Sequence, residues 1–153
     1  MPQTNERLLY RVSGQLPRGF QGHISYTTLL PGELRALRVV FTFDKREPQQ
    51  EPDTLRAGCM AAAAQNLPEG TPEALAEHLC TMPKGEINVS LFLNGACVGS
   101  AHRNQLTKEM LLAPQGSSEG FVNCRPTGVL RVVLHVLNVL NDETNYTLRL
   151  EEV

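Results

Sequence analysis

The sequence contains no tryptophan, and aromatic residues make up only 5% of it. Sandwich domains that bind sugars often stack them on exposed aromatic rings. The few aromatic residues fall mostly on alternating strand patterns that assign them to the core, as do Phe41, Phe43, Phe92 and Tyr146. We therefore do not expect an aromatic sugar platform, whereas a polar, loop-based sugar site remains compatible with the sequence.

Long apolar runs and basic clusters are also absent. No apolar stretch approaches the ~20 residues that cross a bilayer, and residues 1–7 lack an apolar segment behind a basic start. The longest basic cluster is the Lys45-Arg46 pair, and the net charge is −2. Phosphate backbones need a basic face. We expect no signal peptide, no membrane association and no nucleic-acid partner, and a cytoplasmic location.

Cysteine spacing excludes the common zinc sites. Cys59, Cys80, Cys97 and Cys124 are separated by 21, 17 and 27 positions, so no C-x-x-C pair occurs. The favoured interpretation is four reduced thiols that behave as small hydrophobic side chains. Disulfides, the alternative, would indicate an oxidising compartment.

What the sequence does contain is a series of short strand patterns in a chain of single-domain length, 153 residues. The alternation of Leu37, Val39, Phe41 and Phe43 is a clear example. Asn94-Gly95, between two further alternating runs, is typical of a tight hairpin turn. Strands are predicted at residues 8–12, 23–30, 37–43, 87–93, 96–102, 106–113, 129–140 and 146–151.

A helical insertion interrupts these strands at about residues 54–82. Residues 54–67 are alanine-rich and capped by Asp53 or Thr54, and Thr71-Pro72-Glu73 begins a second helix that runs to residue 82. Because the helices are grouped and do not alternate with strands, a doubly wound α/β sheet is not expected.

The predicted fold is mainly β: one antiparallel β-sandwich over residues 1–153, jelly-roll-like or immunoglobulin-like. Residues 129–140 are apolar on both faces, so we expect a central strand covered on both sides, with the 54–82 helices over one of them. The layout resembles jelly-roll and carbohydrate-module sandwiches in architecture alone, which implies no function.

Candidate chemistry is sparse. Residues 116–120 match G-x-S-x-G, but no helix follows, and His135 precedes Asp142 where the hydrolase order needs the acid first. The interpretation is a flexible loop. Residues 141–145 carry oxygen ligands that calcium could use, and a polar turn is favoured. We expect no metal, no nucleotide cofactor and no catalytic residues.

The histidines His23, His78, His102 and His135 show no metal-ligand spacing. His135 stands out because it lies within the most apolar predicted strand. The favoured interpretation is a buried, hydrogen-bonded imidazole or an edge-facing residue, and the alternative is a catalytic or ligand-binding role.

The favoured function is therefore a non-enzymatic binding or protein-interaction domain, with a protein partner or self-association. The alternative is a small-ligand or carbohydrate binder, or an enzyme, whose site is assembled from distant residues. The weak candidates for such a site are His102, Arg103, His135 and Asp142.

Overall fold

The computed structural model describes residues 6–48, 57–58, 60–61, 64–70, 72, 84–103 and 105–153. Within these ranges the chain is mainly β and forms eight strands, and each falls where the sequence predicts one. The strands are β1 (Arg7–Leu16), β2 (Gly22–Leu29), β3 (Leu37–Phe43), β4 (Glu86–Leu93), β5 (Ala96–Ala101), β6 (Thr107–Leu112), β7 (Val129–Asn138) and β8 (Thr144–Glu152).

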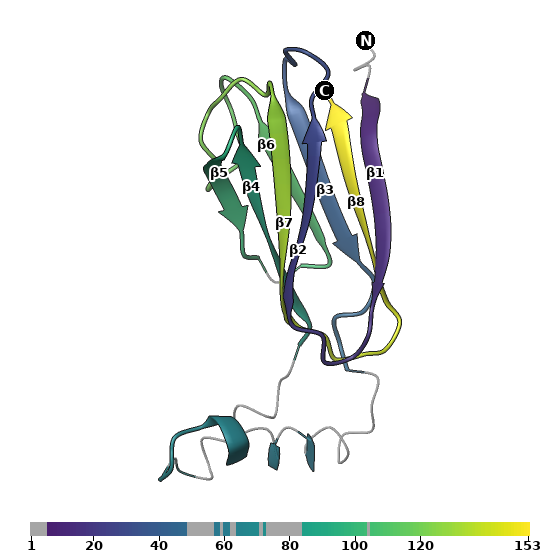
Figure 1. The fold of residues 1–153 in the computed structure, drawn as a ribbon, viewed down its shortest axis with the longest axis vertical. Coiled ribbons are helices and arrows are strands. Elements are labelled where there is room, and N and C mark those ends of the chain that lie inside the picture. Colours follow the sequence, from purple (N-terminus) through teal and green to yellow (C-terminus); the bar gives the residue numbers. More distant parts are fainter. Residues whose placement is uncertain are drawn as a thin grey trace.

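The strands form two four-stranded antiparallel sheets, with the orders β1-β8-β3-β6 and β2-β7-β4-β5, that pack face to face (Figure 1). Each sheet interleaves strands from the two halves of the chain. This is the strand order of an eight-stranded jelly roll, so the topology decides between the two sandwich types that the sequence left open. We call the two sheets the β8 sheet and the β7 sheet.

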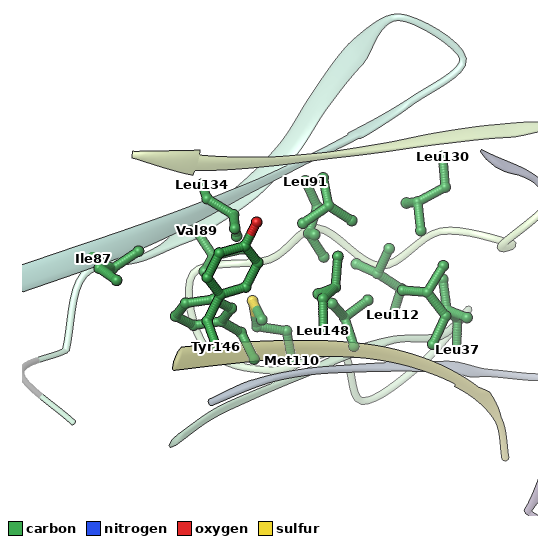
Figure 2. Packing of buried hydrophobic residues seen from close by; sticks show 14 of the residues in the cluster. Leu37, Ile87, Val89, Leu91, Met110, Leu112, Leu130, Leu134, Tyr146 and Leu148 are labelled. Carbon is green, nitrogen blue, oxygen red and sulfur yellow. The ribbon is translucent and has the colours of Figure 1, made fainter. Parts of the chain in front are cut away.

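The core lies between the sheets and consists of the inward-facing side chains of both. Figure 2 shows Val89, Leu91 and Leu134 of the β7 sheet facing Met110 and Leu148 of the β8 sheet. The alternation predicted for residues 37–43 is confirmed, because Leu37, Val39, Phe41 and Phe43 are all buried. Hydrophobic burial of this kind dominates the stability of a small domain.

Local turn chemistry accounts for the tightest connection. Asn94 and Gly95 join β4 to β5, and both have positive φ angles, 51° and 85°. A two-residue hairpin of this type needs positive φ at both central positions, which asparagine and glycine tolerate best. The Asn94 side chain also accepts a hydrogen bond from the Val129 amide at 2.9 Å. The hairpin is therefore tied to the neighbouring strand β7.

The three tyrosines of the chain gather where the edges of β1 and β2 meet. The Tyr26 and Tyr146 hydroxyls lie 2.5 Å apart, and the Tyr10 and Tyr26 ring centroids are 6.5 Å apart. Burial and the bond to Tyr26 raise the pKa of the Tyr146 hydroxyl. Gly14 makes room for the Tyr146 ring, because a Cβ at that position would lie 2.3 Å from the Tyr146 hydroxyl oxygen.

Strand β7 is central, as predicted, since it pairs with both β2 and β4. The expectation that both of its faces are covered holds on the inner face, but among the apolar residues of the outer face only at Val133, which is 6% exposed. Leu130, Val132, Leu134 and Val136 are buried against the other sheet. On the outer face, however, Val129 and Leu137 are 42% and 47% exposed.

The predicted helical insertion is partly described. Residues 57–58, 60–61 and 64–66 are helical, and the second predicted helix, at 71–82, lies outside the described residues. Ala61 and Ala64 are exposed to solvent. Because the ends of the outer face of β7 are also exposed, the prediction that these helices cover this face is not met in the part of the chain that the structure describes.

The chain leaves the sandwich for this insertion, and returns to it, at adjacent points. The amide of Gly85 donates a hydrogen bond to the carbonyl of Arg46 at 2.7 Å. The strand that precedes the insertion is in the β8 sheet, and the strand that follows it is in the β7 sheet. The insertion is therefore the connection between the two sheets at this point.

Candidate functional site

The outer face of the β7 sheet brings together two of the four predicted site residues. His135 lies on β7 and has His23 of β2 and Asn88 of β4 as its cross-strand partners. His102 directly follows β5 and is close enough to lower the pKa of His135. These residues meet because the register of neighbouring strands aligns them on one face. We call His23, Asn88, Ser90, Ser100, His102 and His135 the polar patch.

A chain of hydrogen bonds crosses this patch. The Ser90 hydroxyl lies 2.7 Å from the Ser100 hydroxyl and 2.8 Å from Nε2 of His135. The His23 ring meets the His135 ring edge-on, with 4.6 Å between the centroids. Burial and the neighbouring His23 and His102 lower the pKa of His135, so its imidazole is neutral at pH 7. The hydrogen bond predicted for His135 is present, but the residue is half-buried where a buried imidazole was expected.

Asn88 has a hydrogen-bond acceptor without a partner, next to the hydrogen bonds between Ser90, Ser100 and His135. The residue is only 6% exposed, and its Nδ2 donates to the Glu86 carboxylate at 3.3 Å. Its Oδ1 is buried and has no hydrogen-bond partner. A buried carbonyl without a donor is costly, and native structures contain few of them. The patch therefore contains a hydrogen-bond acceptor that the described protein groups leave unsatisfied.

A second feature occupies the other end of the same face. Leu29 is 75% exposed and is the cross-strand partner of Val129. In the next row, the Arg131 guanidinium lies 4.4 Å from the centroid of the Phe92 ring. We call Leu29, Phe92, Val129 and Arg131 the apolar patch. The outer face thus combines a hydrogen-bonding region with exposed apolar surface.

The open edge of the sandwich between β5 and β6 contains a cleft of about 420 Å³. Its lining includes Ser100, His102, Arg103, Lys108, Glu119 and Phe121. Arg103, another predicted candidate, forms an ion pair with Glu119 at 3.1 Å on the rim. Because Ser100 and His102 belong to both features, the cleft adjoins the polar patch.

Lys108 is the most unusual residue of the cleft. It lies on the inward face of β6 and is 4% exposed. Burial lowers the pKa of its ammonium to about 8, and Arg46 adds to this effect while Glu86 opposes it. Lys108 was not among the predicted candidates. Its place in the alternation of β6 indicates burial, because it shares a face with Met110 and Leu112, both of which are buried.

The fourth predicted candidate, Asp142, belongs to a turn. Its Oδ1 accepts a hydrogen bond from the Arg18 amide at 3.0 Å. In the same loop, Thr144 donates to the Asn141 carbonyl at 2.7 Å, and Asn145 donates to Asp44. These oxygens therefore hold the β1–β2 and β7–β8 connections together, and the polar-turn interpretation of residues 141–145 fits the structure. Asp142 does not join the other candidates.

The G-x-S-x-G segment is likewise structural. The Ser118 hydroxyl accepts the Leu111 amide at 2.8 Å, and the Ser117 hydroxyl bonds to the backbone of Ala113. Gly116 and Gly120 both have positive φ angles. These contacts fasten the loop to the end of β6, so Ser118 serves the loop and not a nucleophile elbow.

The described residues contain neither a metal-binding cluster nor a helix that could span a membrane. No three His, Cys, Asp or Glu side chains among them are placed to share a metal ion. None of the helices within the described ranges has both the length and the apolar character that crossing a bilayer requires.

The fold and the outer face define a jelly-roll β-sandwich with a mixed polar and apolar sheet surface. The chain belongs to a family described as a family of unknown function (DUF6669), whose model matches residues 6–151. No curated protein matches the sequence. Among solved structures, a carbohydrate-binding module, CBM36, in complex with calcium and xylotriose is similar at 11% identity and a TM-score of 0.31. The similarity covers 97% of this chain and 92% of that one.

Proposed function

We propose that the protein is a non-enzymatic protein-interaction domain that binds its partner on the outer face of the β7 sheet. The observation that carries this proposal is the exposure of Leu29 and Val129 beside Phe92 and Arg131. Contiguous exposed apolar surface marks interaction sites, and aromatic residues and arginine are enriched in interfaces. The neighbouring polar patch would supply directional hydrogen bonds and hence specificity.

The surroundings of Ser90 and His135 support a non-enzymatic role. A serine activated by histidine for acyl transfer needs donors that stabilise an oxyanion. Ser90 lies on β4, which pairs with β5 on one side and β7 on the other, so its backbone amides are engaged in the sheet. Among the described residues, no carboxylate is hydrogen-bonded to His135. Within the described part of the chain, the pair therefore has neither a carboxylate hydrogen-bonded to His135 nor a free Ser90 amide to bind an oxyanion.

Site-specific photocrosslinking in native host cells tests the proposal. A benzophenone side chain placed at Thr27, the cross-strand partner of Arg131 in the apolar patch, should crosslink to a protein, either a partner or a second copy of this chain. Leu29→Ser and Val129→Ser should each abolish the crosslink, because they remove the apolar contact.

Leu8→Ser is the matched control. Leu8 is 54% exposed on β1, in the opposite sheet, and its replacement should leave the crosslink intact. The proposal is wrong if the crosslink survives Leu29→Ser and Val129→Ser, or if Leu8→Ser removes it equally.

A second candidate function is binding of a neutral carbohydrate at the polar patch. The specific observation is the uncharged set of Ser90, Ser100 and neutral His135 beside the unpartnered Asn88 Oδ1. Hydroxyl-rich ligands donate and accept hydrogen bonds in the way that such a set requires.

An NMR titration with neutral oligosaccharides distinguishes this candidate. Binding should shift the amide signals of residues 88–90 and 100, and Ser100→Ala should weaken it, whereas Ser13→Ala on the opposite sheet should not. The carbohydrate candidate fails if millimolar oligosaccharide shifts none of these signals.

A further inference from the structure

The cleft between β5 and β6 contains a lysine whose amine forms no ion pair with the described residues. Lys108 Nζ donates a hydrogen bond to the Gln105 carbonyl at 3.1 Å and lies 5.7 Å from the centroid of the Phe43 ring. No carboxylate of the described residues forms an ion pair with it. A buried ammonium without a carboxylate partner is strongly disfavoured relative to the neutral amine.

The other two lysines of the sequence have such partners. Lys45 Nζ lies 3.9 Å from Asp44 and donates to the Glu143 carbonyl, and Lys84 Nζ lies 3.8 Å from Glu47. Both side chains are considerably more exposed than Lys108. Lys108 therefore differs from them in both burial and charge compensation.

We infer that Lys108 is a reactive amine and that this cleft is a covalent binding site for small aldehydes. A cavity of about 420 Å³ lies within the size range of small-molecule sites. Lys108 and the buried Met110 form part of its lining, and Lys108 Nζ donates to the carbonyl of Gln105, another lining residue, so a molecule in the cleft lies beside the Lys108 side chain.

The charges around the amine agree with this inference. Burial has the largest effect and lowers the pKa of Lys108 to about 8, Arg46 lowers it further, and Glu86 raises it. At pH 7 about a tenth of such an amine is neutral and nucleophilic, against well under a thousandth of an ordinary lysine.

The other titratable side chains of the cleft lining belong to His102, Arg103, Glu109 and Glu119. Arg103 and Glu119 neutralise each other on the rim.

The reaction is a condensation and needs no oxidant or reductant. The lone pair of the neutral Nζ attacks the carbonyl carbon of the aldehyde, and the first amine proton moves to the oxygen to give a carbinolamine. The hydroxyl then leaves with the second amine proton as water, which forms the carbon–nitrogen double bond of the imine. The adduct is therefore reversible in water.

Reductive trapping tests the inference on the whole protein. The folded chain is incubated at pH 7 with glycolaldehyde and sodium cyanoborohydride, which delivers hydride to the imine carbon and fixes the adduct as a secondary amine. Peptide mass spectrometry then compares Lys45, Lys84 and Lys108 in one sample. Lys108 should be modified faster than the other two by about tenfold or more.

Two controls connect this rate to the cleft. In concentrated urea the three lysines should react at similar rates, because the surroundings of Lys108 are lost. Glu86→Gln should accelerate the modification of Lys108 at pH 7, because it removes the carboxylate that raises the pKa of this amine. The rates at Lys45 and Lys84 should not change.

A Lys108 rate at or below those of Lys45 and Lys84 in the folded protein overturns the inference. An unchanged Lys108 rate in Glu86→Gln overturns it as well, because the reactivity would then not arise from the charges around the amine.

Discussion

His135 makes the stability of the protein depend on pH in a defined direction. Its pKa lies below the ordinary value because burial and two neighbouring imidazoles disfavour the charged ring. Just below pH 6.5 the unfolded chain therefore binds more protons at this position than the folded chain does. Stability is fully present above the unfolded pKa and is lost as the pH falls through that window.

Urea unfolding at pH 7.5, 6.5 and 5.5 measures this effect. The free energy of unfolding should fall with pH in the wild type and fall less in His135→Gln, which keeps a polar side chain beside Ser90. An equal or steeper decline in His135→Gln would contradict the assignment.

The two faces of β7 differ in what a truncation costs. Leu134→Ala removes a side chain that is 1% exposed in the core, and we expect a loss of about 2–4 kcal/mol from the unfavourable cavity. Val133→Ala should cost about 1–2 kcal/mol, because Val133 is buried among the polar side chains of the outer face. Leu137→Ala, on the same strand, should change stability by less than about 0.5 kcal/mol.

Equilibrium denaturation of the three variants measures their losses in the free energy of unfolding. A large loss in Leu137→Ala would mean that something covers the outer face in solution.

At the level of the strands, the packing of β1 against β8 requires a glycine at position 14. Gly14 pairs with Tyr146, whose ring occupies the space that a side chain at position 14 would need. Gly14→Ala should therefore displace the ring, weaken its hydrogen bond to Tyr26 and lower stability by about 1–3 kcal/mol. Thermal unfolding measures the loss, and Ser13→Ala on the same strand is the control that should be nearly silent.

Strand positions were predictable because most of them rest on local information. The alternation at residues 37–43 and the Asn94-Gly95 pair each encode their structure within a few residues. The two-sided burial predicted for residues 129–140 failed for a physical reason. Valine and leucine occur on exposed surfaces as well as in cores, so Val129 and Leu137 could not be assigned by type.

The candidate site was predictable only in part. His135 was identified because a histidine in an apolar strand is conspicuous, and His102 does lie close to it. Ser90 and Asn88 were missed because cross-strand register decides which residues meet, and register cannot be derived from one strand alone. Asp142 lies apart from the other candidates, in a turn, and the sequence did not reveal this because an aspartate that holds a turn has the same sequence signature as one in a site.

For the molecule as a whole, the helical insertion and the sandwich should be separable. Arg46 and Gly85 are joined by a backbone hydrogen bond, so a short linker can connect the strands on either side. Replacing residues 49–83 with a short Gly/Ser linker should leave a cooperative unfolding transition and a strand-dominated circular dichroism spectrum. Loss of cooperative unfolding would show that the sandwich needs the insertion.

The thiols give a test of the cellular compartment. Cys97 is exposed and Cys124 half-buried, and both are free, whereas Cys59 and Cys80 lie outside the described residues. We propose a reducing compartment such as the cytoplasm, and we expect all four cysteines to react with a thiol reagent in denaturant without reductant. Two unreactive pairs would contradict this proposal.

The place of β8 has a consequence for how the chain folds during synthesis. β8 is the last strand in the sequence, yet it lies between β1 and β3 and is hydrogen-bonded to both. Until β8 leaves the ribosome, no strand joins β1 to β3. The inward face of the β7 sheet is then only partly covered by the strands of the β8 sheet. Nascent chains should therefore expose unpaired strand edges until β8 has emerged and paired, which is the period when such chains depend on chaperones.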